Sequence, residues 1–324
     1  MKTPALYCCN ETGCNRAPLV PGDDGLHCPN KHFFPYVEGS KVPVFAYQQD
    51  EVNEYTIEDA AAIHDNSLRW VFNTFGSDEQ TLRRSLIARL RLSKGATILV
   101  TGAGAGNDLP YFAESLKGGG VIYAQDIAKQ MLMAGVHRHE AQVNALGVTI
   151  HFSVSDATNL PFGDDVFDAA YHFGGINLFP DVRKGISEMD RVVKPGGRIV
   201  ICDEGAAPWL RHTELGKMLI KNNPLYAFDV PLALLPATAR EVNLSWEVGN
   251  CFYVIDYTVS DRQLEINIDA PHIGKRGGTI RTRYSGQLEG VDPALRDRVY
   301  AEAENLGLSR VEYIERLLKK SVSE

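Results

Sequence analysis

An alternation of short apolar runs and helix-like segments, from about residue 97 to residue 204, most constrains how this chain can fold. The apolar runs include TILVTG, VIYAQDI, VTIHFSVSD, FDAAYHFG and RIVICDEG, and segments such as KQMLMAGVHRHEAQVN separate them. Parallel strands need long crossover connections, which helices usually supply. The alternation therefore predicts an α/β domain built on a doubly wound, mostly parallel sheet.

The first apolar run leads into a glycine-rich turn, ILVTGAGAGNDLPYF, at residues 98–112. Gly102, Gly104 and Gly106 allow a tight turn and a close approach of the backbone to a ligand. In doubly wound folds, ligands bind beyond the carboxyl ends of the strands, beside the first strand-to-helix turn. We therefore expect a ligand here, with a purely structural turn as the alternative.

Two acidic residues follow the next strands at positions suited to a nucleotide-like ligand. Asp126 ends the second strand, twenty positions after Gly106, where a carboxylate commonly binds ribose hydroxyls. Its alternative role is a helix N-cap. Asp156 follows the third strand and could accept the amine of an adenine, with Ala157 leaving room for the ring. Its alternative role is to bond only its own loop.

The glycine spacing argues against a nicotinamide dinucleotide. The Gly-x-Gly-x-x-Gly fingerprint would require a third glycine at Asn107 if counted from Gly102, or at Leu109 if counted from Gly104. Residues 240–259 also alternate around Gly249-Asn250, which predicts an antiparallel hairpin. Hydride transfer is therefore not expected.

Residues 95–208 resemble the class I S-adenosylmethionine (SAM)-dependent methyltransferases, especially the ubiquinone and menaquinone C-methyltransferases. The motifs that carry the resemblance are GAGAG at 102–106, Asp126, DA at 156–157, LPF at 160–162, FD at 167–168, FGGINLFPD at 173–181 and RVVKPGGRIVI at 191–201. The resemblance implies a seven-stranded sheet with antiparallel final strands. It implies that SAM is bound by Thr101, Gly102, Gly104, Gly106, Asn107, Asp126, Ile127, Met131, Asp156 and Ala157.

Within this set the resemblance gives each residue a role. The glycine loop holds the methionine part of SAM, Asp126 the ribose and Asp156 the adenine amine, with Ile127 or Met131 against the ring. One position departs from the family, because Val100 stands where these enzymes usually carry an acidic residue, two positions before the first glycine. Asn107 or Asp108 is expected to share the contact to the SAM amino group instead.

Residues after the fourth and fifth strands are the candidates for catalysis. By the resemblance, His172 faces the substrate side of the transferred methyl group. Methyl transfer depends largely on positioning, to which a general base is sometimes added, and His172 is the first candidate for that base. Asp203 and Glu204 end the fifth strand and are second candidates. The alternatives are a packing role for His172 and a capping role for one of the acids.

The first 45 residues are rich in Cys, Gly, Pro and Asn and have too few periodic apolar positions to form a core alone. Cys9-x4-Cys14 and Cys28-x3-His32 supply three thiolates and an imidazole, which suits a structural Zn2+. Cys8 competes with Cys9 for the first ligand position. The segment also resembles the zinc ribbons that precede some methyltransferases, notably rRNA guanine methyltransferases. Unrelated free thiols are the alternative.

These features divide the chain into four parts: a zinc-ribbon-like segment at 1–45, a helical lead-in at 46–94, a class I methyltransferase domain at 95–260 and a C-terminal helical extension at 261–324. In the extension, TIRTRY reads as a strand before two helices, the second capped by Ser309. Ribbon-helix-helix units, which this rhythm resembles, dimerise through such a strand. A helical pair packed on its own subunit is the alternative to a homodimer.

Composition limits the partners. The formal net charge is −8, which disfavours a nucleic-acid partner. Residues 1–45 balance four basic against four acidic side chains: Lys2, Arg16, Lys31 and Lys41 against Glu11, Asp23, Asp24 and Glu38. The sequence shows no secretory leader and no run of about 18 apolar residues, so a cytoplasmic protein without a membrane span is expected.

The expected function is SAM-dependent methylation of a small, apolar or aromatic metabolite. One alternative is an rRNA-base methyltransferase that grips RNA with the zinc ribbon. Another is a SAM-sensing, DNA-binding regulator that uses the C-terminal helices.

Overall fold

The computed structural model describes residues 6–9, 14, 16–46, 55–116, 118–274, 277–285, 288 and 291–322. The chain divides into two compact units, Met1–Gln263 and Leu264–Glu324. Among the described residues, no helix combines the length and the apolar character needed to cross a membrane.

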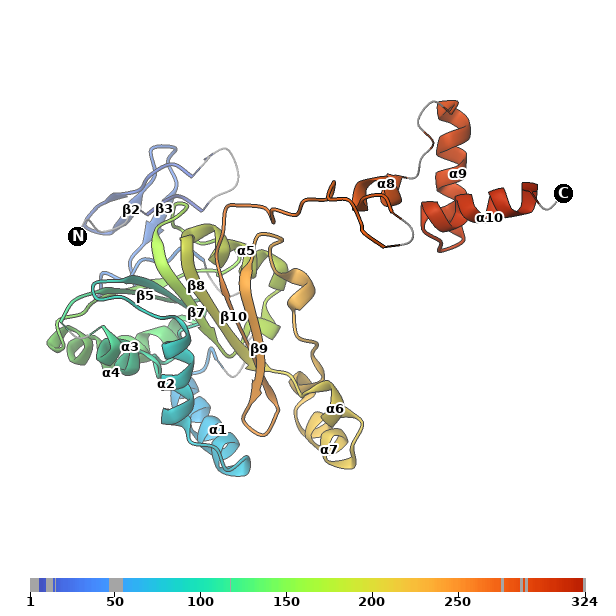
Figure 1. The fold of residues 1–324 in the computed structure, drawn as a ribbon. Helices are drawn as coiled ribbons and strands as arrows, with labels where there is room; N and C mark the ends of the chain where they lie inside the picture. The colour runs from blue at the N-terminus through green and yellow to red at the C-terminus, as the bar shows by residue number, and fades with distance from the viewer. Residues whose placement is uncertain are drawn as a thin grey trace. The chain divides into compact units, whose positions relative to one another are not determined.

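A seven-stranded sheet in the order β6-β5-β4-β7-β8-β10-β9 forms the centre of the first unit (Figure 1). The strands from β6 to β8 are parallel, whereas β10 is antiparallel to both β8 and β9. This confirms the predicted fold class, including the final hairpin. The strands are β4 (Thr97–Thr101), β5 (Val121–Asp126), β6 (Thr149–Val154), β7 (Phe167–Phe173), β8 (Val193–Glu204), β9 (Arg240–Glu247) and β10 (Phe252–Thr258).

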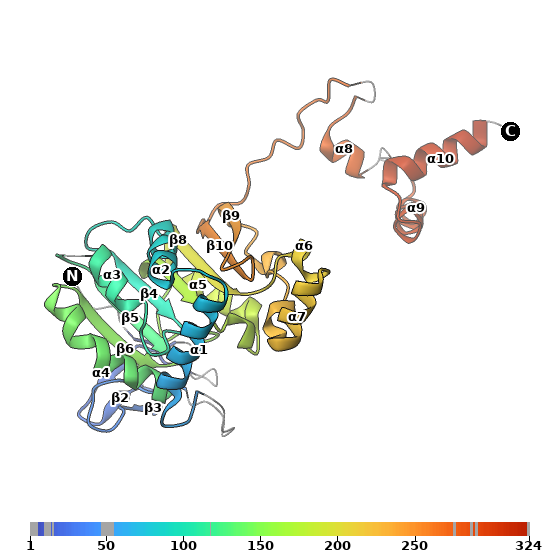
Figure 2. The same cartoon turned by 90° about the horizontal axis from the view of Figure 1, so that it is seen from below.

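Apolar side chains cover both faces of the sheet, as parallel strands require. Ile98 and Val100 of β4 belong to one buried layer with Phe112 of α3. Leu99, between them in sequence, belongs to the opposite layer with Ile186 of α5, because successive strand residues point to opposite faces. Figure 2 shows α3 and α4 beside the β4 to β6 half of the sheet. The helices of this unit are α1 (Ala60–Thr74), α2 (Glu79–Arg89), α3 (Leu109–Ser115), α4 (Lys129–Ala145), α5 (Val182–Val192), α6 (Pro208–Arg211) and α7 (Glu214–Asn222).

A small antiparallel sheet precedes the large one. It consists of β1 (Val20–Pro21), β2 (Gly25–His27) and β3 (Phe33–Pro35) in that order. Among the described residues of this segment, the buried apolar cluster has five members, three of them cysteines: Cys8, Cys14, Leu26, Cys28 and Phe34. Such a cluster is small for an independent core. Two bridges, Leu6 to Phe162 and Val44 to Val154, join this segment to the large sheet and its loops.

The second unit contains α8 (Ile280–Ser285), α9 (Pro293–Asn305) and α10 (Arg310–Val322). The predicted strand at TIRTRY is wrong, because Ile280–Ser285 is helical. Thr279 and Thr282 form reciprocal side-chain to backbone hydrogen bonds of 2.8 and 3.1 Å at the start of α8. Such a capping box starts a helix in spite of β-branched residues. Ser309 accepts from the Glu312 N–H at 3.3 Å and caps α10 as predicted; dimerisation stays a prediction.

Candidate active site

A cavity of about 340 Å³ lies at the carboxyl ends of the parallel strands. Its volume is within the range of about 300–1,000 Å³ that is common for small-molecule sites. Most residues predicted to bind a cofactor line it: Gly102, Gly104, Asn107, Asp126, Ile127, Met131, Asp156 and Ala157. Thr101 and Gly106 are not among the lining residues. The crossover topology thus brings three separate sequence motifs to one place.

The glycine loop needs glycine for conformation and for space. Gly102, Gly104 and Gly106 have φ values of 59°, 51° and 80°, in the left-handed region that favours glycine. A Cβ on Gly102 would lie 2.8 Å from His172 Cε1, and one on Gly106 would lie 2.8 Å from Leu109 Cδ1. A side chain at any of these positions would therefore strain the backbone, and at Gly102 or Gly106 it would also crowd a neighbouring side chain.

Asp126 ties the glycine loop to the end of β5. Its Oδ2 accepts from Gly104 N–H at 2.7 Å, and its Oδ1 accepts from Ala128 N–H at 2.7 Å. Burial raises the pKa of Asp126, and these backbone donors oppose that effect. Asp126 is not the N-cap of α4, which is Ala128. The carboxylate lines the cavity while it holds the loop.

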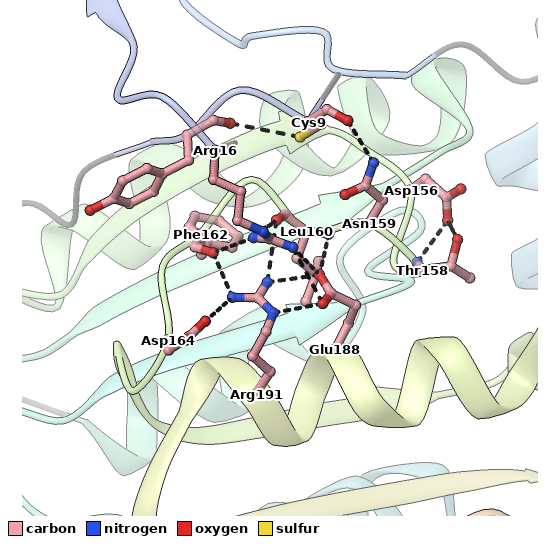
Figure 3. Close-up of polar contacts among 11 residues, drawn as sticks. Cys9, Arg16, Asp156, Thr158, Asn159, Leu160, Phe162, Asp164, Glu188 and Arg191 are labelled. Carbon is pink, nitrogen blue, oxygen red and sulfur yellow. Dashed lines mark hydrogen bonds and ion pairs between the residues drawn. The ribbon is translucent and has the colours of Figure 1, made fainter. Parts of the chain in front are cut away.

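Asp156 occupies the turn after β6. Its Oδ1 accepts from both the backbone N–H of Thr158 at 2.7 Å and the Thr158 hydroxyl at 2.8 Å (Figure 3). The alternative role, bonding to its own loop, is therefore present. Asp156 and Ala157 nevertheless both line the cavity, so the turn presents Asp156 in a fixed orientation.

His172 lies at the end of β7 and is completely buried. Its Nδ1 is 3.0 Å from Thr101 Oγ1, and Phe179 packs edge-on against the ring at 5.2 Å. Burial lowers the pKa of His172, so the imidazole is neutral at neutral pH. Within the described part of the chain, Nε2 has no hydrogen-bond partner. With Nδ1 protonated, Nε2 could accept a proton from a molecule in the cavity.

The two acids after β8 have different surroundings. Asp203 accepts from the backbone N–H groups of Gly175, Asn177 and Glu204 at 3.2, 2.8 and 2.8 Å. It does not line the cavity, so it orders the loop after β7 and is not placed to act as a base. Glu204 does line the cavity. Burial and the adjacent Asp203 carboxylate raise the pKa of Glu204 well above its usual range, which favours the protonated form of its carboxyl group.

Arg83 of α2 is a cavity residue that the sequence did not indicate. It is buried, forms ion pairs with Asp108 at 2.8 Å and Glu79 at 2.6 Å, and lies over the Phe173 ring at 4.8 Å. Asp108 also accepts from the Tyr171 hydroxyl at 3.0 Å. Arg83 lies within a helix whose pattern indicated only core packing, and nothing local marks it as a site residue.

Asn107 donates to Asp65 Oδ1 of α1 at 3.0 Å. Asn107 and Asp108 are expected to bind the SAM amino group in place of the acid that is absent at position 100. Both line the cavity, but Asn107 bonds to Asp65 and Asp108 pairs with Arg83. Val100 itself is buried in the core. The amino-group contact stays a prediction.

The lining of the cavity also includes a group of apolar and aromatic residues, called the apolar wall below. Its residues come from the lead-in helix, from the loop after β7 and from segments beyond β8: Leu68, Phe173, Leu178, Phe179, Pro180, Leu225 and Phe252. Tyr55 and His64 add polar groups at this wall. Such a wall suits a flat, apolar molecule with few polar groups.

A second cluster, defined by Cys8, Cys14, Cys28 and His32, lies in the N-terminal segment. Its ligand atoms are all within 4.8 Å of one another. The Cys14 and Cys28 sulfurs are 3.1 Å apart, well beyond the ~2.05 Å of a disulfide. Asn30 N–H donates to the Cys28 sulfur at 3.4 Å. Three thiols and one imidazole match a common ligand set of structural zinc.

The geometry replaces Cys9 with Cys8 in this set. The Cys8 sulfur is 3.4 Å from His32 Nδ1, whereas the Cys9 sulfur faces the Tyr7 carbonyl oxygen at 3.7 Å. Burial raises the pKa of Cys9 to about 12, so it remains a thiol. Neighbouring residues of an extended segment point to opposite sides, and spacing alone could not tell which sulfur faces the cluster.

Residues 99–201 match a family described as a methyltransferase domain. The chain is 34% identical over 128 residues to a demethylmenaquinone methyltransferase of Corynebacterium kroppenstedtii. The aligned region covers 40% of this chain and 50% of that protein. It is 39% identical over 114 residues to the Clavibacter sepedonicus protein of the same name, with coverages of 35% and 43%. The matched region thus spans about half the length of these curated relatives or less.

Among solved structures, the chain is similar to phosphoethanolamine N-methyltransferase 2 of Haemonchus contortus in complex with S-adenosyl-L-methionine. The TM-score is 0.50 and the identity 15%, over 68% of this chain and 62% of that one. This likeness concerns the fold alone. The region that matches the methyltransferase-domain family, residues 99–201, therefore lies in a domain with the fold of this solved methyltransferase.

Proposed function

We propose that this chain, whose residues 99–201 match a methyltransferase domain, transfers the methyl group of SAM to a small, apolar or aromatic acceptor of the quinone type. The observation that carries the proposal is the single cavity shared by the glycine loop, Asp126 and Asp156 on one side and by an aromatic wall on the other. The names of the relatives, demethylmenaquinone methyltransferases, support the acceptor class.

The cofactor side fits SAM by the chemistry of its donors and acceptors. Asp126 offers carboxylate oxygens to the ribose, and Asp156 offers Oδ2 to the adenine amine because its two bonds from Thr158 use Oδ1. Gly104 leaves the backbone open, since the nearest atom to a Cβ there would be Met131 Cε at 3.6 Å. When bound, SAM would supply an activated methyl group with a sulfide leaving group.

The acceptor side suits a nucleophile that loses a proton as it is methylated. His172 Nε2 would accept that proton, and the Thr101 hydroxyl at Nδ1 holds the ring in orientation. Glu204 would contribute a carboxyl group to the same cavity. The apolar wall would exclude water and align the acceptor with the methyl carbon, which is the larger part of the rate enhancement.

A methyl-transfer assay tests this function. The purified chain is incubated with methyl-labelled SAM and a soluble demethylmenaquinone analogue, which is tested in its quinone and hydroquinone forms. An rRNA fragment is added as the competing acceptor. We expect label in the apolar acceptor. Label in the RNA alone would show that the acceptor is RNA and not a quinone-type molecule. If calorimetry detects no SAM binding, the proposed function is wrong.

We further propose that Cys8, Cys14, Cys28 and His32 bind one structural Zn2+. A closed set of four ligands leaves no open position for catalysis, and metal binding would supply stability that the small apolar cluster lacks. Cys28→Ser is expected to lose the metal in elemental analysis and to lower the melting temperature. The matched control, Cys9→Ser, is expected to keep both. Metal-free wild-type protein with an unchanged melting temperature would contradict the proposal.

A further inference from the structure

The Cys/His cluster and the adenine side of the cavity are linked by a short chain of contacts. Two parts of the N-terminal segment, residues 7–9 and Arg16, dock on residues 159–162, which continue the turn that carries Asp156 and are called the adenine loop below (Figure 3). Tyr7 N–H donates to the Pro161 carbonyl at 2.9 Å. The Asn159 side chain donates to the Cys9 carbonyl at 2.8 Å. The first docking segment therefore surrounds Cys8, a member of the cluster.

Arg16 forms the second docking point, two residues after Cys14. Its guanidinium donates to the Leu160 carbonyl at 3.1 Å and the Phe162 carbonyl at 2.9 Å, and it pairs with Glu188 of α5 at 3.2 Å. These bonds span 144 and 146 residues of sequence. One side chain of the N-terminal segment thus fixes two carbonyl groups of the adenine loop.

Glu188 completes the network from the opposite side. It accepts from the Leu160 N–H at 2.8 Å and pairs with Arg191 at 2.6 Å, which also bonds the Phe162 carbonyl at 2.9 Å. Burial opposes ionisation of Glu188, but Arg191, Leu160 N–H and Arg16 lower its pKa below the usual value. The ionised carboxylate thus holds the loop between two guanidinium groups.

The cluster itself fixes both docking segments. Cys8 N–H donates to the Ala17 carbonyl at 2.9 Å, and Ala17 N–H donates to the Cys14 carbonyl at 3.0 Å. A metal held by Cys8 and Cys14 would lock the two segments to each other and to Cys28 and His32. Without the metal, the two segments would keep these backbone bonds and the small apolar cluster but would lose the link to Cys28 and His32.

We infer that metal occupancy of the Cys/His cluster is coupled to SAM binding, with Arg16 and Asn159 as positioning residues for the Asp156 turn. The inference rests on the proposed function for its cofactor. The coupling is reciprocal, because a metal that favours the SAM-binding geometry must itself be favoured by bound SAM. The N-terminal segment thereby gains a role at the active site without touching the cofactor.

The first experiment measures the loop without SAM. Hydrogen exchange of peptides covering residues 156–162 is compared in zinc-loaded wild-type protein, after chelation and after zinc is returned. We expect faster exchange after chelation, reversed by zinc. Arg16→Ala should exchange faster with its zinc still bound, whereas the control Lys41→Ala, in the same segment but bonded to Asp23, should not. Unchanged wild-type exchange on metal removal would overturn the coupling.

The second experiment measures affinities. By calorimetry with S-adenosylhomocysteine, Arg16→Ala and Asn159→Ala are expected to bind roughly 5- to 150-fold more weakly than wild type, the usual range of coupling between sites, at equal zinc content. Arg16→Lys, which keeps the charge but cannot form the forked bonds, should be intermediate. The ligand should also slow zinc transfer to a chelator in wild type and not in Arg16→Ala. Equal affinities and equal transfer rates would overturn the inference. A wild type that binds no ligand yet shows the exchange change would overturn the proposed function and leave only a link between the metal and the loop.

Discussion

The two sides of the cavity differ in how far apart in sequence their residues lie. The cofactor side comes from residues 102–157, at the ends of three consecutive parallel strands. The acceptor side draws on α1, α2, the loop after β7 and segments near residues 225 and 252. The residues proposed to bind the cofactor can therefore be recognised from short sequence motifs. The residues proposed to bind the acceptor are brought together only by packing between distant segments. Substitutions on one side are therefore expected to leave the other side largely unchanged.

The largest effect is expected from His172 on the acceptor side. His172→Gln keeps a polar side chain but removes the base, so turnover should fall by about 10²- to 10⁴-fold while SAM affinity stays nearly unchanged. Steady-state kinetics and calorimetry measure the two quantities. Full turnover in this variant would make His172 a packing residue and leave Glu204 as the acid or base to examine.

A smaller effect, on the cofactor side, is expected from Asp126. Asp126→Ala removes the acceptors of Gly104 and Ala128 and the proposed ribose contact. SAM affinity should fall by roughly 10- to 100-fold, corresponding to about 1.5–3 kcal/mol for hydrogen bonds to a charged group. Asp261→Ala, at an exposed position after β10, is the control. Unchanged affinity in calorimetry would contradict the cofactor assignment.

Truncation of the apolar wall should act on the acceptor alone. Leu178 lines the cavity but is 53% exposed, so Leu178→Ala should affect folding little. Loss of about 1 kcal/mol of apolar contact should raise the KM of the acceptor about fivefold, with SAM affinity unchanged. A parallel loss of SAM affinity would mean that the two sides of the cavity are not separable.

The smallest effect concerns acid stability. Because burial lowers the folded-state pKa of His172, the unfolded chain binds a proton more readily as the pH falls below about 6.5. The contribution of neutral His172 is therefore complete above that pH and is lost as acidification approaches the folded-state pKa. When the pH is lowered from 7.5 to 5.5, the melting temperature of wild type should fall by more than that of His172→Gln. An equal loss in both proteins would show that His172 does not contribute.

The same contrast explains what the sequence could and could not predict. Asp126 and Asp156 were visible because each follows a recognisable strand at a fixed distance from the glycines. Arg83 was not, since nothing within α2 shows that Asp108 and the Phe173 ring lie against it. The strand predicted at TIRTRY is a helix in the structure, because Thr279 and Thr282 form a capping box that starts a helix there. Cys8 and Cys9 differ only in side-chain direction, which a spacing does not record.

The docking of Arg16 on Glu188, 172 residues further along the chain, has a consequence for the order of events during synthesis. At about 5–20 residues per second, the ribosome completes that docking surface on the order of ten to thirty seconds after the first segment is made. The Cys/His cluster needs only residues up to His32. A metal ion bound at that stage would keep the nascent N-terminal segment folded before the surface around Glu188, on which Arg16 docks, has been synthesised.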